Sequence, residues 1–237
     1  MISNVKLIKK ETIADGTMAF YFEKPKDVEF RAGQFADYTL IDPPETDAEG
    51  NIRGFSLVQA PYEDYLVAAT RMRDTAYKRV LKDMAVGTEV KFDGPYGDFT
   101  LHKTLTTPAV FLIGGIGITP VRSMIAQATH DKVDQEITLL YSNRTPELAA
   151  FHEDLAGFAA ENDKFTYVPV YTEAKMPEWD GDTGYINADI VKKYVPDMNK
   201  PIYYISGPAT MVAAMRKILV DADVNEDNIR TEEFSGY

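Results

Sequence analysis

The pattern of hydrophobic residues changes once along this chain, at the segment His102–Thr107. Before it, short runs rich in Val, Ile, Thr, Phe and Tyr are separated by Gly and Pro, which is typical of an antiparallel barrel or sandwich. After it, short apolar runs alternate with segments of helical periodicity, which indicates βαβ units around a parallel sheet. The sequence therefore predicts an antiparallel β-barrel domain over residues 1–103 and an α/β parallel-sheet domain over residues 108–237.

The expected elements follow from these runs. Strands of the first half are expected at Val5–Glu11, Thr17–Glu23, Gln34–Leu40, Gly54–Val58, Tyr65–Arg71 and Glu89–Asp93. Strands of the second half are expected at Val110–Ile113, Ile137–Ser142, Phe165–Tyr171, Ile202–Ser206 and Ile229–Glu232. Helices are expected at Thr75–Met84, Pro120–Thr129, Pro146–Ala160, Asn187–Tyr194 and Pro208–Val220. One helix therefore interrupts the strand-rich half, and Thr75 is suited to cap it.

Composition limits the chemistry that this chain can perform. It contains no cysteine, which excludes disulfides, thiolate nucleophiles and cysteine-ligated zinc or iron–sulfur centres. A net charge of -12 disfavours non-specific binding to nucleic acid. The three histidines, His102, His130 and His152, lie far apart and are expected on the surface, so no metal site is expected.

No targeting or membrane-spanning segment is expected. The first sixteen residues lack a long apolar run after their charges, unlike a signal peptide. The most apolar segment, Pro108–Val121, is short and rich in Gly and Pro, so it is not expected to cross a bilayer. We expect a cytoplasmic protein, and we expect the acidic residues Glu45, Asp47 and Glu49 to form a solvated loop.

The strongest local motif is GGIGITP at residues 114–120, between an expected buried strand and an expected helix. Glycine permits a sharp turn and the close approach of a phosphate or a ring to the backbone. Thr119 is suited to the N-cap and Pro120 to the first helical position, and the free amides there attract an anion. The motif is not GxGxxG, because Pro120 and Val121 stand where the last glycine is expected. A glycine-rich turn without a ligand is the alternative.

A second strand–turn–helix joint repeats this design, with Gly207 at the end of a strand and Pro208 at the start of a helix. Ligands of parallel α/β sheets bind beyond the carboxyl ends of the strands, so the two turns are expected to face one crevice. A helix start without a ligand explains the second joint equally well on its own.

The strand-rich half also carries candidate binding groups. Arg53, Phe55 and Ser56 place a cation, an aromatic ring and a hydroxyl on one strand, which suits a phosphate, a flat ring and its polar edge. The helix that Thr75 begins offers free amides, and Lys78 and Arg79 follow there, so a second anionic group is expected. An exposed arginine and a solvated basic helix face are the alternatives.

Taken in order, these motifs resemble the ferredoxin–NADP reductase superfamily, in which a flavin-binding barrel precedes a nucleotide-binding domain. The matching pieces are RGFS at 53–56, GPYGDF at 94–99, GGIGITP at 114–120, YSNRT at 141–145, SGP at 206–208 with Met211, and EFSGY at 233–237. They cover almost the whole chain in the family's order. The resemblance implies an enzyme in which NADPH or NADH gives hydride to bound FAD and electrons pass on to an acceptor.

The resemblance also implies which residues hold the flavin. Arg53 matches the arginine that pairs with the pyrophosphate, Phe55 the aromatic that packs on the isoalloxazine ring, and Ser56 the hydroxyl near flavin N5. The segment Thr75–Lys78 matches the turn that wraps the pyrophosphate. Further flavin contacts are expected at Leu57, Thr70, Arg71, Thr75, Tyr77 and Lys78.

For the pyridine nucleotide, the resemblance implies contacts from both strand–turn–helix joints. They are expected at Gly115, Gly117, Thr119, Pro120, Gly207, Pro208 and Met211. Ser142 and Arg144 match the adenosine end, where a guanidinium suits a 2′-phosphate, so NADPH is favoured over NADH.

The catalytic residues implied are Ser56, Ser206 and a carboxy-terminal aromatic, either Phe234 or Tyr237, that covers the flavin. Many family members carry cysteine where this chain has Ser206, which keeps a small hydrogen-bonding group but lacks the polarizable sulfur. Phe55 likewise lacks the hydroxyl of the family's tyrosine.

The electron acceptor is expected to be separate from this chain, because the chain has no cysteine for an iron–sulfur centre. A ferredoxin, a flavodoxin or an oxygenase component is expected. Free flavin, ferric chelates and quinone are alternatives, as is a nucleotide-sensing or docking subunit with little turnover. A nucleic-acid module is disfavoured by the net charge of -12, and the oligomeric state is left open.

Overall fold

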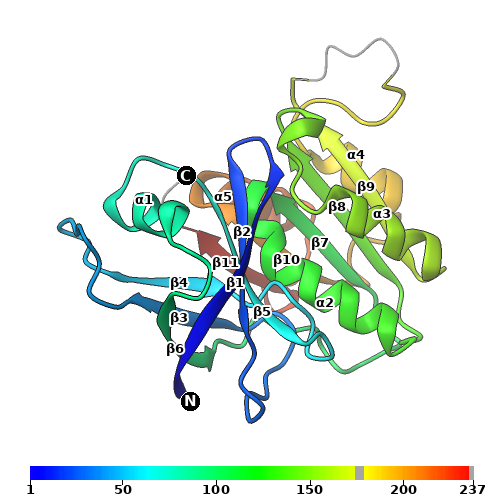
Figure 1. The fold of residues 1–237 in the computed structure, drawn as a ribbon. Helices are drawn as coiled ribbons and strands as arrows, with labels where there is room; N and C mark the ends of the chain where they lie inside the picture. The colour runs from blue at the N-terminus through cyan, green and yellow to red at the C-terminus, as the bar shows by residue number, and fades with distance from the viewer. Residues whose placement is uncertain (174–178, 235–237) are drawn as a thin grey trace.

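The computed structural model describes residues 1–173 and 179–234, which form two sheets (Figure 1). The first is antiparallel, with strand order β4-β3-β6-β1-β2-β5, and the second is parallel, with order β11-β10-β7-β8-β9. Strands of the first sheet are β1 (Ile2–Ala14), β2 (Thr17–Glu23), β3 (Phe35–Leu40), β4 (Ile52–Ser56), β5 (Tyr65–Arg71) and β6 (Glu89–Tyr96). Strands of the second are β7 (Ala109–Gly114), β8 (Ile137–Asn143), β9 (Phe165–Tyr171), β10 (Ile202–Pro208) and β11 (Ile229–Phe234). The predicted fold class, a barrel followed by an α/β domain, is confirmed.

The strand β1 joins the two halves of the antiparallel sheet, because it pairs with both β6 and β2. Its first residues, Ile2–Lys6, pair with β6, and the rest of the strand pairs with β2 across a register shift after Leu7. Alternate residues of the strands point into one core, whose largest members include Phe20, Tyr38 and Phe92. The helix α1 (Ala76–Asp83) follows β5, and the Thr75 side chain caps it by accepting a hydrogen bond from the Lys78 amide, as predicted.

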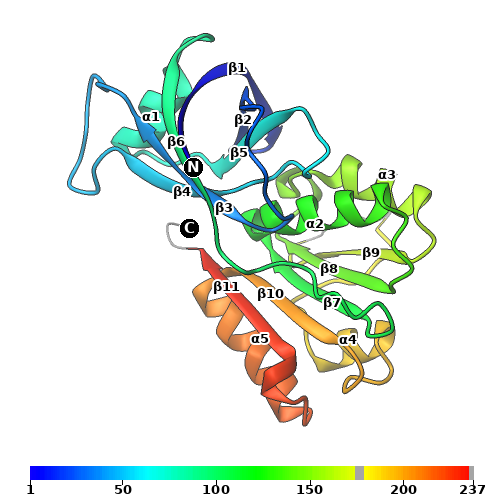
Figure 2. The ribbon, with the colours of Figure 1, turned by 90° about the horizontal axis from the view of Figure 1, so that it is seen from below.

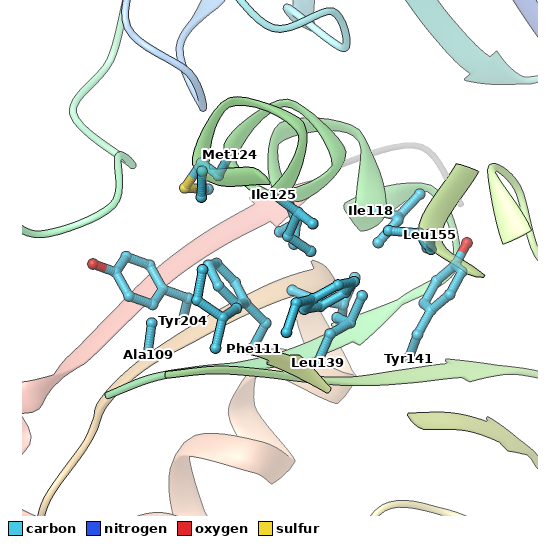
Figure 3. Packing of buried hydrophobic residues seen from close by; sticks show 14 of the residues in the cluster. Ala109, Phe111, Ile118, Met124, Ile125, Leu139, Tyr141, Leu155 and Tyr204 are labelled. Carbon is cyan, nitrogen blue, oxygen red and sulfur yellow. The ribbon is translucent and has the colours of Figure 1, made fainter. Parts of the chain in front are cut away.

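The parallel sheet lies between two layers of helices (Figure 2). The helices are α2 (Ile118–His130), α3 (His152–Glu161), α4 (Ala188–Tyr194) and α5 (Ala209–Asp221). Every residue of β7 is buried, as expected of a strand covered on both faces. On one face, Met124 and Ile125 of α2 pack over Phe111 and Tyr204, and Leu155 of α3 lies near Tyr141 (Figure 3). Residues of α4 and α5 pack on the other face.

The two domains are tied together by polar contacts beneath α2. The Ser123 hydroxyl donates to the Gln59 carbonyl oxygen at 2.6 Å. The guanidinium of Arg122 pairs with Glu63 of the barrel and with Asp154 of α3, at 2.8 Å for the latter. Because Arg122 and Glu63 are both largely buried, this ion pair fixes how the domains sit against each other.

Several sequence-based predictions are corrected by the structure. The expected helix Pro146–Ala160 is broken, because Phe151 adopts a left-handed conformation with φ 61 between a 3₁₀ turn and α3. Thr119 is not the N-cap of α2: a 3₁₀ turn over Gly115–Gly117 comes first, so Gly117 holds that position. The hydroxyl of Thr119 instead donates to the Ile116 carbonyl oxygen at 3.0 Å.

Two further corrections concern the second half of the chain. Pro208 ends β10, and α5 begins at Ala209. His102 is buried rather than exposed, and its ring lies 3.0 Å from the Tyr204 hydroxyl and 2.9 Å from the Thr107 carbonyl oxygen. Among the described residues, no helix is both long enough and apolar enough to cross a membrane.

The buried Arg122–Glu63 pair predicts a measurable loss of stability. Glu63→Gln is expected to lower the free energy of unfolding by about 2–3 kcal/mol, near the lower end for a broken buried pair because Asp154 still faces Arg122. Urea denaturation measures the loss. Lys217→Ala, which breaks an exposed pair with Asp221, is the control and should leave stability almost unchanged. Equal small effects of the two substitutions would contradict the prediction.

Candidate functional site

A cavity of about 460 Å³ lies where the barrel meets the glycine-rich turn. We call it the cation-lined cavity. It is lined by Glu49, Arg53, Gly54, Phe55, Ser56, Ala69, Thr70, Arg71, Arg73, Thr75, Lys78, Ile116, Thr119 and Phe234. The predicted flavin residues on β4, on β5 and at the start of α1 are thereby brought together. Two of them do not line it, Leu57 and Tyr77.

Leu57 and Tyr77 instead support the wall of the cavity. Leu57 is fully buried in the barrel core. The Tyr77 hydroxyl donates to the Tyr38 carbonyl oxygen at 2.9 Å, and its ring lies under the Arg53 guanidinium at 5.1 Å. Tyr77 therefore holds the backbone and the arginine in place from behind.

Positive charge is concentrated in this cavity although the chain is acidic overall. Arg53, Arg71, Arg73 and Lys78 all line it. Burial lowers the pKa of Lys78, and the nearby charges of Arg73 and Arg53 lower it further. The Lys78 ammonium also donates to the Arg71 carbonyl oxygen at 2.7 Å. Such crowding of cations at the start of a helix favours an anion with more than one negative charge.

The opposite part of the cavity suits a flat ring. The hydroxyl residues Ser56 and Thr70 are both buried, and the side chain of Phe55 packs against Tyr77 with ring centroids 6.0 Å apart. Phe234, at the end of β11, reaches the same cavity from the parallel sheet. Of the two carboxy-terminal aromatics considered from the sequence, Phe234 thus lines the cavity, and Tyr237 lies outside the described residues. This arrangement of phosphate-binding and ring-binding groups fits a flavin dinucleotide.

A second cavity, also of about 460 Å³, lies beyond the carboxyl ends of β7, β8 and β10. We call it the sheet-end cavity. The predicted nucleotide residues that line it are Gly115, Ser142, Arg144, Pro208 and Met211. Arg71 lines this cavity as well as the cation-lined one, so the two adjoin at its side chain. Within the described residues the Arg71 guanidinium has no ion-pair partner.

Of the remaining predicted nucleotide residues, Thr119 lines the cation-lined cavity, and Gly117 and Gly207 lie at the contact between the two glycine turns. A Cβ atom on Gly117 would stand 2.5 Å from the Ser206 carbonyl oxygen and 2.7 Å from the Gly207 amide nitrogen. One on Gly114 would stand 2.2 Å from the Met211 sulfur. The two turns therefore face one another, as predicted. Gly117 is required by this packing because its neighbours are backbone atoms, whereas the Met211 side chain beside Gly114 is flexible. Pro120 lies in the first turn of α2, just after these glycines.

Sequence reasoning missed a carboxylate beside the second turn. Ser206 pairs in register with Glu232 of the neighbouring strand, and Thr231 and Glu233 point to the other side. The Ser206 hydroxyl and one Glu232 carboxylate oxygen are buried, and neither has a hydrogen-bond partner among the described residues. Burial, and then the charge of Asp98, raises the pKa of Glu232 to about 7. The alternation of β11, which puts Glu232 and Phe234 on one face, was the available signal.

Two missed residues also line the sheet-end cavity. Tyr185 is 81% exposed there, although large aromatic side chains are usually covered. Glu173 lies beside Arg144, whose carbonyl oxygen accepts a hydrogen bond from the Glu173 amide at 2.9 Å. Both residues lie between β9 and α4, so only the folded arrangement relates them to the site.

Comparison with known proteins agrees with this arrangement. Residues 111–217 match the family described as "Oxidoreductase NAD-binding domain". A ferredoxin NADP+ reductase from Neisseria gonorrhoeae, solved with bound FAD and NADP, superposes with a TM-score of 0.80 at 22% identity over 98% of each chain. The chain therefore has the fold of this ferredoxin NADP+ reductase.

Other known proteins are similar to this chain in fold or in sequence. The FAD/NAD-binding domain of nitric oxide dioxygenase from Vibrio cholerae gives a TM-score of 0.85 at 18% identity, over 98% of each chain. One component of the Na(+)-translocating NADH-quinone reductase from Pseudoalteromonas atlantica is 32% identical over 91% of this chain and 56% of its own length. The corresponding component from Idiomarina loihiensis is 31% identical over 63% of this chain, which covers only 38% of that longer protein.

The raised pKa of Glu232 predicts a pH dependence of stability. The folded protein holds a proton near pH 7 that the unfolded chain releases near its ordinary pKa of 4.5, so stability is full below about pH 4.5 and falls as the pH rises through 7. Glu232→Gln is expected to remove about 2–3 kcal/mol of this loss between pH 5 and 8.

Urea denaturation at several pH values measures the effect. Glu233→Gln, at the exposed neighbouring position, is the matched control and should keep the wild-type dependence. A Glu232→Gln variant with the wild-type pH dependence would show that Glu232 does not hold the proton.

Proposed function

We propose that this chain is a reductase that holds FAD in the cation-lined cavity and NADH or NADPH in the sheet-end cavity, and that it delivers electrons to a separate acceptor. The observation that carries this proposal is the junction of the two cavities at Arg71. When bound, FAD supplies a ring that accepts hydride and releases electrons singly or in pairs. The protein orients FAD and the nicotinamide nucleotide, and its cations bind their phosphates.

Arg53, Arg73 and Lys78, with the amides at the start of α1, are suited to hold the pyrophosphate of FAD. The hydroxyls of Ser56 and Thr70 are placed to hydrogen-bond the polar edge of the ring, since both line the cavity and both are buried.

Phe234 is placed to cover the ring from the side of the parallel sheet. A side chain in that position excludes water from the flavin and must move aside when nicotinamide stacks there. Behind it, Glu232 holds a proton around neutral pH next to the Ser206 hydroxyl, which puts an exchangeable proton at the junction of the two domains.

In the sheet-end cavity, the exposed ring of Tyr185 is suited to stack on adenine. Arg71, at the junction, is suited to pair with the phosphates of the nucleotide. The charges at the adenosine end oppose one another: Arg144 favours a 2′-phosphate and hence NADPH, whereas Glu173 repels that phosphate and suits a ribose hydroxyl, hence NADH.

The acceptor proposed is a redox protein or a quinone outside this chain. Its curated relatives are named as components of an NADH-quinone reductase, and the sequence has no cysteine to ligate an iron–sulfur centre. A nucleotide-sensing protein would need only the sheet-end cavity. The cations that line the other cavity therefore favour the reductase.

Anaerobic reduction tests this function. The purified protein, incubated with FAD, is expected to retain a yellow flavin that loses its visible absorbance when NADH or NADPH is added. Acceptors such as ferredoxin, quinone and ferric chelates are then added in turn, and the one that restores the absorbance fastest is identified. Protein that stays colourless after incubation with FAD would contradict the proposal, and so would bound flavin that chemical reductant bleaches but neither nucleotide does.

Reciprocal charge changes test the nucleotide preference. Arg144→Ala is expected to raise the KM for NADPH about tenfold and to leave that for NADH nearly unchanged, because only NADPH carries the 2′-phosphate. Glu173→Gln is expected to lower the KM for NADPH relative to NADH severalfold. Steady-state flavin-dependent turnover with each nucleotide measures both ratios, and equal losses with the two nucleotides would disprove the assignment.

A further inference from the structure

The acidic loop between β3 and β4 is exposed to solvent, as expected from the sequence, but its carboxylates are paired. Its carboxylates Glu45, Asp47 and Glu49 each contact a cation or a helix amide. Glu45 pairs with the Arg79 guanidinium through two hydrogen bonds of 2.9 and 2.6 Å, away from the cation-lined cavity. The other two carboxylates reach toward that cavity.

Asp47 and Glu49 occupy donors that line the proposed pyrophosphate site. One Asp47 oxygen accepts from the Ala76 amide, in the first turn of α1, at 3.1 Å. The other lies 3.8 Å from the Arg53 guanidinium. A Glu49 carboxylate oxygen accepts from the same guanidinium at 2.8 Å, and Glu49 itself lines the cavity.

The loop backbone completes this enclosure of Arg53. One terminal nitrogen of the guanidinium donates to the carbonyl oxygens of Ile52 at 2.7 Å and Glu49 at 3.0 Å. The donors of Arg53 are therefore largely satisfied by the loop itself. A phosphate group that binds Arg53 must exchange with these oxygens, because a guanidinium has a fixed set of donors.

The beginning of the loop is fixed to α1, whereas its end can move out of the cation-lined cavity. The Glu45–Arg79 pair fixes its beginning. At its end, the Glu49 side chain is 72% exposed, and Gly50, with φ +74, has open space around it. Glu49 can therefore move into solvent at little cost, since an exposed ion pair contributes little stability.

We propose that the carboxylates of Asp47 and Glu49 are an internal anion that competes with the flavin pyrophosphate for Arg53 and the α1 amides. The proposal rests on the proposed function in placing FAD there. Binding is then an exchange of anions in which the segment 47–50 leaves the cavity. The loop weakens FAD binding and raises the selectivity of the cavity for ligands whose negative charge at least matches that of the two carboxylates.

Titration of the whole protein with FAD and with riboflavin, followed by flavin fluorescence, tests the exchange. Asp47→Asn/Glu49→Gln is expected to bind FAD about tenfold more tightly than wild type and riboflavin equally well, because riboflavin carries no phosphate. Glu45→Gln, in the same loop but bound to Arg79, is the matched control and should leave both affinities unchanged. Unchanged or weaker FAD binding by the double variant would overturn the proposal, and weaker binding would make the loop a support for Arg53.

Hydrogen–deuterium exchange separates this proposal from the assignment of FAD. FAD is expected to speed exchange in the segment 47–50, and inorganic pyrophosphate at high concentration should do the same. If FAD binds neither the wild type nor any variant but pyrophosphate still speeds exchange in the segment 47–50, the anion exchange is supported and the assignment of FAD is wrong. Slower exchange in the loop with either ligand would overturn the proposed competition.

Discussion

The site depends on the contact between the two glycine turns at the carboxyl ends of β7 and β10. Gly117 lies against the backbone of Ser206 and Gly207, closer than any side chain permits. This contact brings two neighbouring strand ends and two helix starts to one place, where ligands of parallel sheets bind. It also sets the depth of Ser206 and the position of Met211 in the cavity wall. A methyl group at Gly117 would push these strand ends apart and open the junction between the cavities.

The cations of the cation-lined cavity attract anionic ligands although the chain as a whole is negatively charged. The chain carries a net charge of -12, which repels dinucleotides at long range, yet screening confines that repulsion to roughly 10 Å at moderate salt. Within that distance a ligand meets Arg53, Arg71, Arg73 and Lys78. The carboxylates of the β3–β4 loop neutralise part of this cluster, so the cations do not simply repel one another in the folded protein. The acidic exterior and the basic cavity together favour ligands that reach the cavity itself.

Local sequence pattern was sufficient for the fold and for part of the site. β2, β5 and β9 match the expected ranges Thr17–Glu23, Tyr65–Arg71 and Phe165–Tyr171, because each is a β-branched or aromatic run between turns. The sequence does not predict the break in the helix at Phe151. Phenylalanine rarely adopts the left-handed conformation that Phe151 has here, so the local residues give no signal for it. Tertiary proximity also decides the rest. The residues around Glu232 do not predict that Asp98, which is far away in the sequence, lies near its carboxylate in the folded protein.

Ser206 and Glu232 show why such residues must be judged from the folded protein. A buried polar atom without a partner costs about 1–3 kcal/mol, and here two stand on neighbouring strands without partners among the described residues. Apolar side chains of similar size would pack in the same ladder without that cost. Polar groups in this position therefore reduce the stability of the folded protein beside the second glycine turn.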